Sequence, residues 1–152
     1  MNAQLVFFIG RKLAHFVKEF AAYSPEVGEL DPETETRDAV IENPLFPGDP
    51  AESLYIEFGD ELTVYWHGHR RFSPEDYWYD MMVEYVHDLL DGRYLVAEVS
   101  DSAGNVLAVL TSRLNPEECT TAAGLFGDSL PENSALCSVF VWGKEPYEIP
   151  IQ

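Results

Sequence analysis

Apolar and polar side chains alternate on both sides of a short Gly-Asp-Glu segment at residues 59–61. Because successive side chains of a strand point to opposite faces, this alternation predicts a β-hairpin over residues 53–67. A two-residue turn at Gly59-Asp60 would mix apolar and polar side chains on one face, whereas a three-residue loop keeps them apart. The expected core-facing pairs are Phe58–Leu62, Ile56–Val64 and Leu54–Trp66. The expected opposite face carries Glu57–Thr63, Tyr55–Tyr65 and Ser53–His67.

Two amphipathic helices flank this hairpin in the sequence. Residues 3–22 place apolar side chains at three- and four-residue spacing, and Ser24-Pro25 ends that helix. A second helix is predicted to open at Ser73-Pro74, with Ser73 as the N-cap, and to stop at Gly92. Its expected buried stripe consists of Trp78, Met81, Met82, Tyr85, Val86, Leu89 and Leu90. Tyr77 and Tyr79 are then expected to be exposed, which would suit a homo-oligomeric contact.

The remaining chain predicts further strands and one long connection. Residues 24–52 contain half of the ten prolines and show no regular pattern, so we expect a long acidic, Pro-rich loop there. Strands are predicted at 94–100, 106–111 and 135–142, with an edge extension at 147–151. Hairpin connections favour antiparallel pairing. We therefore expect one α+β domain spanning residues 1–152, with a single antiparallel sheet of four to six strands covered on one face by two helices.

The charge balance restricts the possible partners. The 152 residues carry a net charge of −18, and residues 25–62 hold twelve acidic residues against one basic residue. Nucleic acid is disfavoured, because phosphate backbones are bound by Lys and Arg patches. A basic protein is the favoured partner. The short apolar run near the N-terminus precedes its positive charges, unlike a secretory signal, and no run is long enough to span a bilayer, so we expect a cytoplasmic location without membrane contact.

The His67-Gly68-His69 segment is the candidate metal site. If the strand continued through Gly68, both imidazoles would project from one face near Glu57, as ligands of zinc or iron. The alternative is that both histidines form hydrogen bonds or stack near the strand end. On the same face, Tyr55 and Tyr65, with Arg70 and Arg71, form a candidate ligand site; guanidinium groups bind carboxylates and stack on aromatic rings. The arginines could instead pair with acidic residues of the chain itself.

A row of carboxylates is predicted along the second helix. It consists of Asp76, Asp80, Glu84 and Asp88 at four-residue spacing. Like charges at this spacing are mildly destabilising, so the row could meet a basic surface, although acidic rows are also typical of solvated helix faces. The sequence contains no Gly-x-Ser-x-Gly turn, phosphate loop or Rossmann glycine pattern. It therefore favours a binding protein over an enzyme, and we expect no cofactor.

Residues 54–110 resemble a group of small acidic bacterial proteins of unassigned function. In that group a strand ending in aromatic-Trp-His-x-His-Tyr/Phe precedes a helix and a hairpin, and here Trp66, His67, His69 and Phe72 match. By size and charge the chain also resembles the immunity partners of polymorphic toxins. This second likeness implies an acidic bacterial immunity protein that neutralises a basic toxin through protein–protein interaction. The alternative hypothesis is a small metal-dependent enzyme or ligand-binding domain using His67 and His69.

Overall fold

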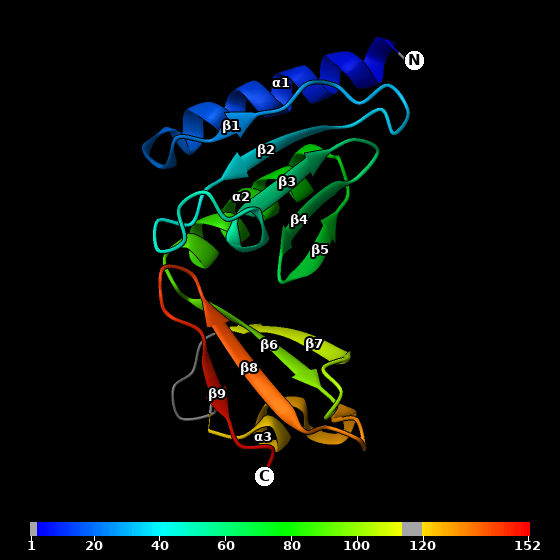
Figure 1. The fold of residues 1–152 in the computed structure, drawn as a ribbon. Coiled ribbons are helices and arrows are strands. Elements are labelled where there is room, and N and C mark those ends of the chain that lie inside the picture. The colour runs from blue at the N-terminus through cyan, green and yellow to red at the C-terminus, as the bar shows by residue number, and fades with distance from the viewer. Residues whose placement is uncertain (1–2, 114–119) are drawn as a thin grey trace. The chain divides into compact units, whose positions relative to one another are not determined.

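The computed structural model describes residues 3–113 and 120–152. It confirms the α+β class and the antiparallel pairing, with three α-helices and two sheets among the described residues (Figure 1). The strands therefore form two sheets, of five and four strands, instead of the single sheet expected. The number of sheets was predicted wrongly because the alternation of side chains shows where strands lie but not which strands pair with one another. The chain divides into two compact units, an N-terminal unit (Met1–His87) and a C-terminal unit (Asp88–Gln152).

The sheet of the N-terminal unit has the strand order β1-β2-β3-β4-β5. Its strands are β1 (Glu26–Val27), β2 (Arg37–Ile41), β3 (Leu54–Phe58), β4 (Leu62–Trp66) and β5 (Gly68–Phe72). The register of the β3–β4 hairpin is the one that the alternation predicts, with Phe58 opposite Leu62 and Tyr55 opposite Tyr65. In the connecting loop Gly59 N donates to Glu61 O at 3.2 Å. The apolar pattern therefore fixed this register correctly.

The expectation of a long loop at residues 24–52 was wrong in part. Strands β1 and β2 lie in it, together with a short 3-10 helix, η2 (Pro50–Glu52). In β2, Ala39 pairs with Ile56 and Ile41 pairs with Leu54, and both side chains of β2 are buried. Only two of the five β2 residues bury apolar side chains in this way, and carboxylates surround them in the sequence. The alternation was therefore too short to recognise.

Two helices pack on the same face of this sheet. From α1 (Ala3–Glu19), the Phe16 ring lies 5.6 Å from the Phe58 ring of β3, between centroids. From α2 (Asp76–Leu90), the Tyr85 ring lies 5.9 Å from the Phe72 ring of β5. The core-facing side chains of β3 and β4 that were expected to be buried are at most 4% exposed. The core of the N-terminal unit is therefore this layer between the sheet and the two helices.

The buried stripe of α2 differs from the predicted one at its start. The helix begins at Asp76, later than Pro74. Tyr79 is 2% exposed whereas Trp78 is 39% exposed, the reverse of the expectation. The reason is the neighbouring helix: the Tyr79 hydroxyl lies 2.6 Å from Nδ1 of His15 in α1, so α1 covers this side of α2. Tyr77, at 67% exposed, lies on the surface beside Trp78, as expected.

The C-terminal unit contains the second sheet, with the strand order β7-β6-β8-β9. Its elements are β6 (Tyr94–Ser100), β7 (Val106–Arg113), α3 (Ala122–Phe126), a 3-10 helix η3 (Gly127–Ser129), β8 (Leu136–Val141) and β9 (Tyr147–Ile149). The predicted strands are thus present, and α3 was not anticipated. Apolar side chains of β6 and β8 pack against Ala122 and Phe126 of α3. Among the described residues, no helix combines the length and apolar character needed to cross a bilayer.

Candidate functional site

The N-terminal sheet has a second face, turned away from α1 and α2, which we call the outer face. Because side chains alternate along each strand, the residues between the buried ones point to this face. The register aligns them in two rows across the strands. The first row is Glu26, Val40, Tyr55, Tyr65 and His69, and the second row is Asp38, Glu57, Thr63 and Arg71. The outer face therefore combines aromatic and ionisable side chains.

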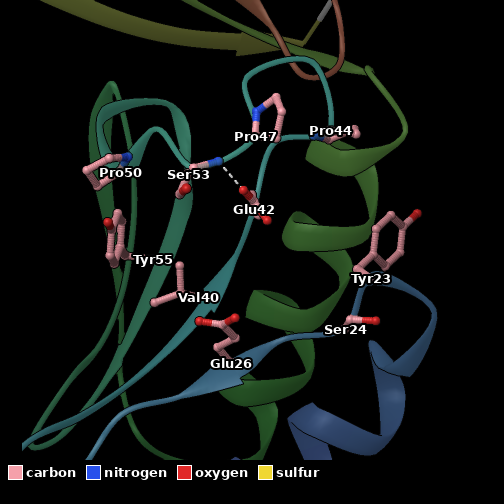
Figure 2. A pocket seen from close by; sticks show the side chains of 11 residues that line it. Tyr23, Ser24, Glu26, Val40, Glu42, Pro44, Pro47, Pro50, Ser53 and Tyr55 are labelled. Carbon is pink, nitrogen blue, oxygen red and sulfur yellow. Dashed lines mark hydrogen bonds between the residues drawn. The ribbon is translucent and has the colours of Figure 1, made fainter.

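Two cavities adjoin at one end of the outer face. The larger, of about 680 Å³, lies along β1, β2 and β3, and Figure 2 shows Glu42 and Val40 between Tyr55 and Tyr23. The smaller, of about 360 Å³, lies on the β4–β5 side and is lined by His67 and His69 among others. Both are lined by Pro50, Ser53 and Tyr55. Tyr55 thus lies between two adjoining hollows of the outer face.

Two carboxylates face each other across the second row. The register puts Asp38 directly opposite Glu57. Burial raises the pKa of Asp38, and the charge of Asp31 raises it further. Burial also raises the pKa of Glu57, as does Asp38, while Arg71 opposes the shift. Like charges directly opposite on neighbouring strands are destabilising. The register therefore sets two carboxylates opposite each other, and the charge of Asp38 disfavours ionisation of Glu57.

Two backbone positions beside the cavities adopt the left-handed conformation. Ser24 has φ 50° and lines the larger cavity, and His67 has φ 58° and lines the smaller one. Residues with a Cβ atom reach this region at a cost of roughly 1–2 kcal/mol. Strained backbone of this kind clusters at binding and catalytic sites, where the surrounding structure holds it in place. Two of the three non-glycine residues with positive φ among the described residues therefore lie at this end of the outer face, and the third is Glu35.

The structure does not support the predicted histidine metal site. The strand does not continue through Gly68, because the chain reverses at His67 and Trp66 pairs with Gly68. Nε2 of His67 lies 2.9 Å from Oε2 of Glu52, whereas His69 lies on β5 opposite Tyr65. Glu57 is in the other row. Within residues 3–113 and 120–152, no three His, Cys, Asp or Glu side chains are close enough to hold a metal ion.

The candidate ligand residues are divided between the two faces of the sheet. Tyr55 and Tyr65 are paired in the first row, and Arg71 is on the outer face, where its Nε lies 3.7 Å from Oε2 of Glu61. Arg70 is opposite the buried Val64 and points the other way. Its guanidinium carbon lies 5.0 Å from the Phe72 ring centroid and 4.7 Å from that of Tyr85. Grouping Arg70 with the two tyrosines was therefore wrong, because adjacent strand residues face opposite sides.

The carboxylate row of α2 is partly engaged within the chain. Asp76 forms an ion pair with the buried Lys12 of α1, and its hydrogen bond to Lys12 is the main reason that the pKa of Asp76 is lowered. Asp88 lies 3.3 Å from Arg93 and 2.9 Å from Arg113. Asp80 and Glu84 are exposed, and neither forms an ion pair with another described residue. Two of the four carboxylates in the row are therefore exposed without an ion pair to another described residue.

Several residues of the site could not be recognised from the sequence. Glu26, Val40 and Glu42 belong to the segment that showed no pattern, and Tyr23 directly precedes it. The pairing of Glu26 with Val40 and of Val40 with Tyr55 brings this part of the chain beside Tyr55. The alternation of Ala39 and Ile41 was the one signal that would have placed Val40 on the outer face.

No family model matches the chain, and neither the curated proteins nor the solved structures include a significant match. The resemblance to small acidic bacterial proteins, and to immunity proteins by size and charge, therefore remains a prediction.

Proposed function

We propose that the chain is a binding protein whose outer face engages a basic protein. In the more specific form of the proposal it is a cytoplasmic bacterial immunity protein, and the partner is a basic toxin. The observation that carries the proposal is the opposed pair of Asp38 and Glu57. A sheet gains nothing in stability from two carboxylates set directly opposite each other. A cationic side chain of a partner would relieve this repulsion on binding, so the arrangement favours the complex.

The surroundings of the pair support the same partner chemistry. Residues 25–62 hold twelve acidic residues. Within the described residues, the ion pairs formed by this segment are those of Glu61 with Arg71 and of Glu52 with His67. The surplus negative charge would steer a basic protein toward the sheet and raise its association rate at low salt. The aromatic first row then supplies contact area, since tyrosine is enriched at protein interfaces.

The experiment compares two charge variants that remove the same number of carboxylates. Wild-type protein and the double variant Asp38→Asn/Glu57→Gln are immobilised, retained proteins are eluted with salt and identified, and the partner is purified for calorimetry. The matched control is Asp80→Asn/Glu84→Gln on α2. We expect a basic partner whose Kd rises with salt, a Kd about tenfold higher for the outer-face variant, and a Kd within about twofold of wild type for the control.

Two results would contradict the proposal. One is a partner without basic character or with salt-independent binding. The other is a loss of affinity in the α2 variant alone, which would place the interface on the helix row. Growth of cells that express the partner with and without this chain tests the immunity hypothesis separately: rescue that needs Asp38 and Glu57 supports it, and toxicity that this chain does not reduce contradicts it.

A further inference from the structure

We propose that the larger cavity of the outer face receives an arginine side chain of the basic partner. This inference rests on the proposed function and names the group that the site would recognise. The cavity measures about 680 Å³, within the range of roughly 300–1,000 Å³ that is usual for ligand sites. It is therefore large enough for a long side chain together with the water molecules that accompany a charged group.

The charge of the lining selects a cation. Two carboxylates, those of Glu26 and Glu42, line the cavity, and none of the described Lys, Arg or His side chains does. Glu42 accepts a hydrogen bond from the backbone N–H of Gly48 through Oε1, which holds the carboxylate in place and leaves Oε2 for a ligand. Figure 2 shows this carboxylate between Tyr55 and Tyr23. An anionic group would meet uncompensated negative charge here, so the cavity excludes phosphates and acidic peptides.

The remaining lining favours a guanidinium group over an ammonium group. Tyr23 and Tyr55 lie on opposite sides of the cavity in Figure 2, and Pro44, Pro47 and Pro50 also line it. A planar guanidinium stacks on aromatic rings and binds a carboxylate through two parallel hydrogen bonds, whereas an ammonium group is a compact and strongly hydrated point charge. Proline also fixes the backbone around the cavity. The tyrosine and proline side chains thus offer flat surfaces beside the Glu42 carboxylate. This combination suits the planar, charged guanidinium group of arginine.

The test uses three capped tripeptides, Gly-X-Gly, in which X is arginine, lysine or citrulline. Citrulline has nearly the shape of arginine without its charge. Binding to the full chain is followed by the amide chemical shifts of Val40, Glu42 and Gly48. We expect saturable shifts in the millimolar range for the arginine peptide, and binding about three- to tenfold weaker for both other peptides. Glu42→Gln keeps an oxygen for Gly48 N and should weaken arginine binding to a similar extent.

Two further variants make the experiment decisive. Glu26→Gln should also weaken arginine binding, whereas Glu29→Gln, which removes an exposed carboxylate outside the cavity lining, should leave it unchanged. The proposal is overturned if the arginine peptide gives no saturable shift in the millimolar range, if citrulline binds equally well, or if Glu29→Gln has the same effect as Glu42→Gln.

The calorimetry of the whole partner separates this inference from the proposed function. If the partner binds with an affinity that depends on Asp38 and Glu57 but not on Glu42, the outer face is the interface and the arginine inference fails. If the arginine peptide binds in the cavity but no basic protein binds the chain, the arginine site stands without the proposed partner.

Discussion

His67 is the turn residue between β4 and β5. Substitutions at His67 test whether the chain reverses direction at this residue. Its backbone has φ 58°, a conformation that glycine adopts freely and other residues reach only with strain. Its side chain is 11% exposed and contacts Glu52, which is 16% exposed, with 2.9 Å between Nε2 and Oε2. Two substitutions separate these effects, because alanine keeps the strain whereas glycine removes it.

The magnitudes follow from these two contributions. Either substitution removes the hydrogen bond to a largely buried carboxylate, which costs about 1–3 kcal/mol of the free energy of unfolding. The alanine variant keeps the left-handed strain of roughly 1–2 kcal/mol. The glycine variant is free of this strain, but it loses about 0.5–1 kcal/mol of stability because glycine gives the unfolded chain more conformational entropy. We therefore expect His67→Gly to be more stable than His67→Ala by about 0.5–1 kcal/mol.

Urea denaturation of both variants measures the difference, and His69 provides the matched control. His69 is the same residue type in the strand β5, opposite Tyr65, and its φ is not positive. There the glycine variant should be less stable than the alanine variant by about 0.5–1 kcal/mol, as in an ordinary strand. If alanine were the better replacement at both positions, the strand would run on through Gly68, and the two histidines would share a face as the sequence suggested.

Three other substitutions test the packing and the electrostatics. Phe58→Ala, at a fully buried position of β3, should lower the free energy of unfolding by about 3–5 kcal/mol in urea denaturation; a loss below about 1 kcal/mol would contradict the core described. Glu57→Gln should raise the melting temperature at pH 7, because the raised pKa values of Glu57 and Asp38 mean that stability is lost as pH rises through the carboxyl range. This gain should vanish below about pH 4, and a gain that persists there would have another cause. Lys12→Met should lower the melting temperature at pH 7, because it removes the nearer of the two cationic partners of Asp76 and leaves Arg11, at 3.8 Å. Since the folded pKa of Asp76 is lowered, that loss should shrink as pH falls through it, and a loss independent of pH would point to packing alone.

The parts of the fold that could be predicted are those in which apolar and polar residues alternate over a whole element and turn residues mark its ends. The hairpin of β3 and β4 satisfied both conditions, so even its register, with Phe58 opposite Leu62, was correct. Strand β2 has too few apolar residues to show its period, and it was missed. The division into two sheets depends on pairing between distant strands, such as β6 with β8, which a local pattern does not reveal.

The candidate site could be predicted only where its residues lie in the β3–β4 hairpin, whose pattern is local. The pairing of Tyr55 with Tyr65 followed from the register and was correct. The positions of His67 and Arg70 depended on whether the strand continued past Trp66. The left-handed position of the turn is His67 and not the adjacent Gly68, so the sequence did not indicate it. The opposition of Asp38 and Glu57 required β2, so the central feature of the outer face was not visible in the sequence.

The most direct test of the central claim is a map of the chain's own surface when a basic partner binds. Amide and side-chain chemical shifts of the free and bound chain can be compared residue by residue. The outer-face account predicts the largest changes at Asp38, Tyr55 and Glu57, with little change at Asp80 and Glu84 of α2. Changes confined to α2, with the outer face unaffected, would contradict it.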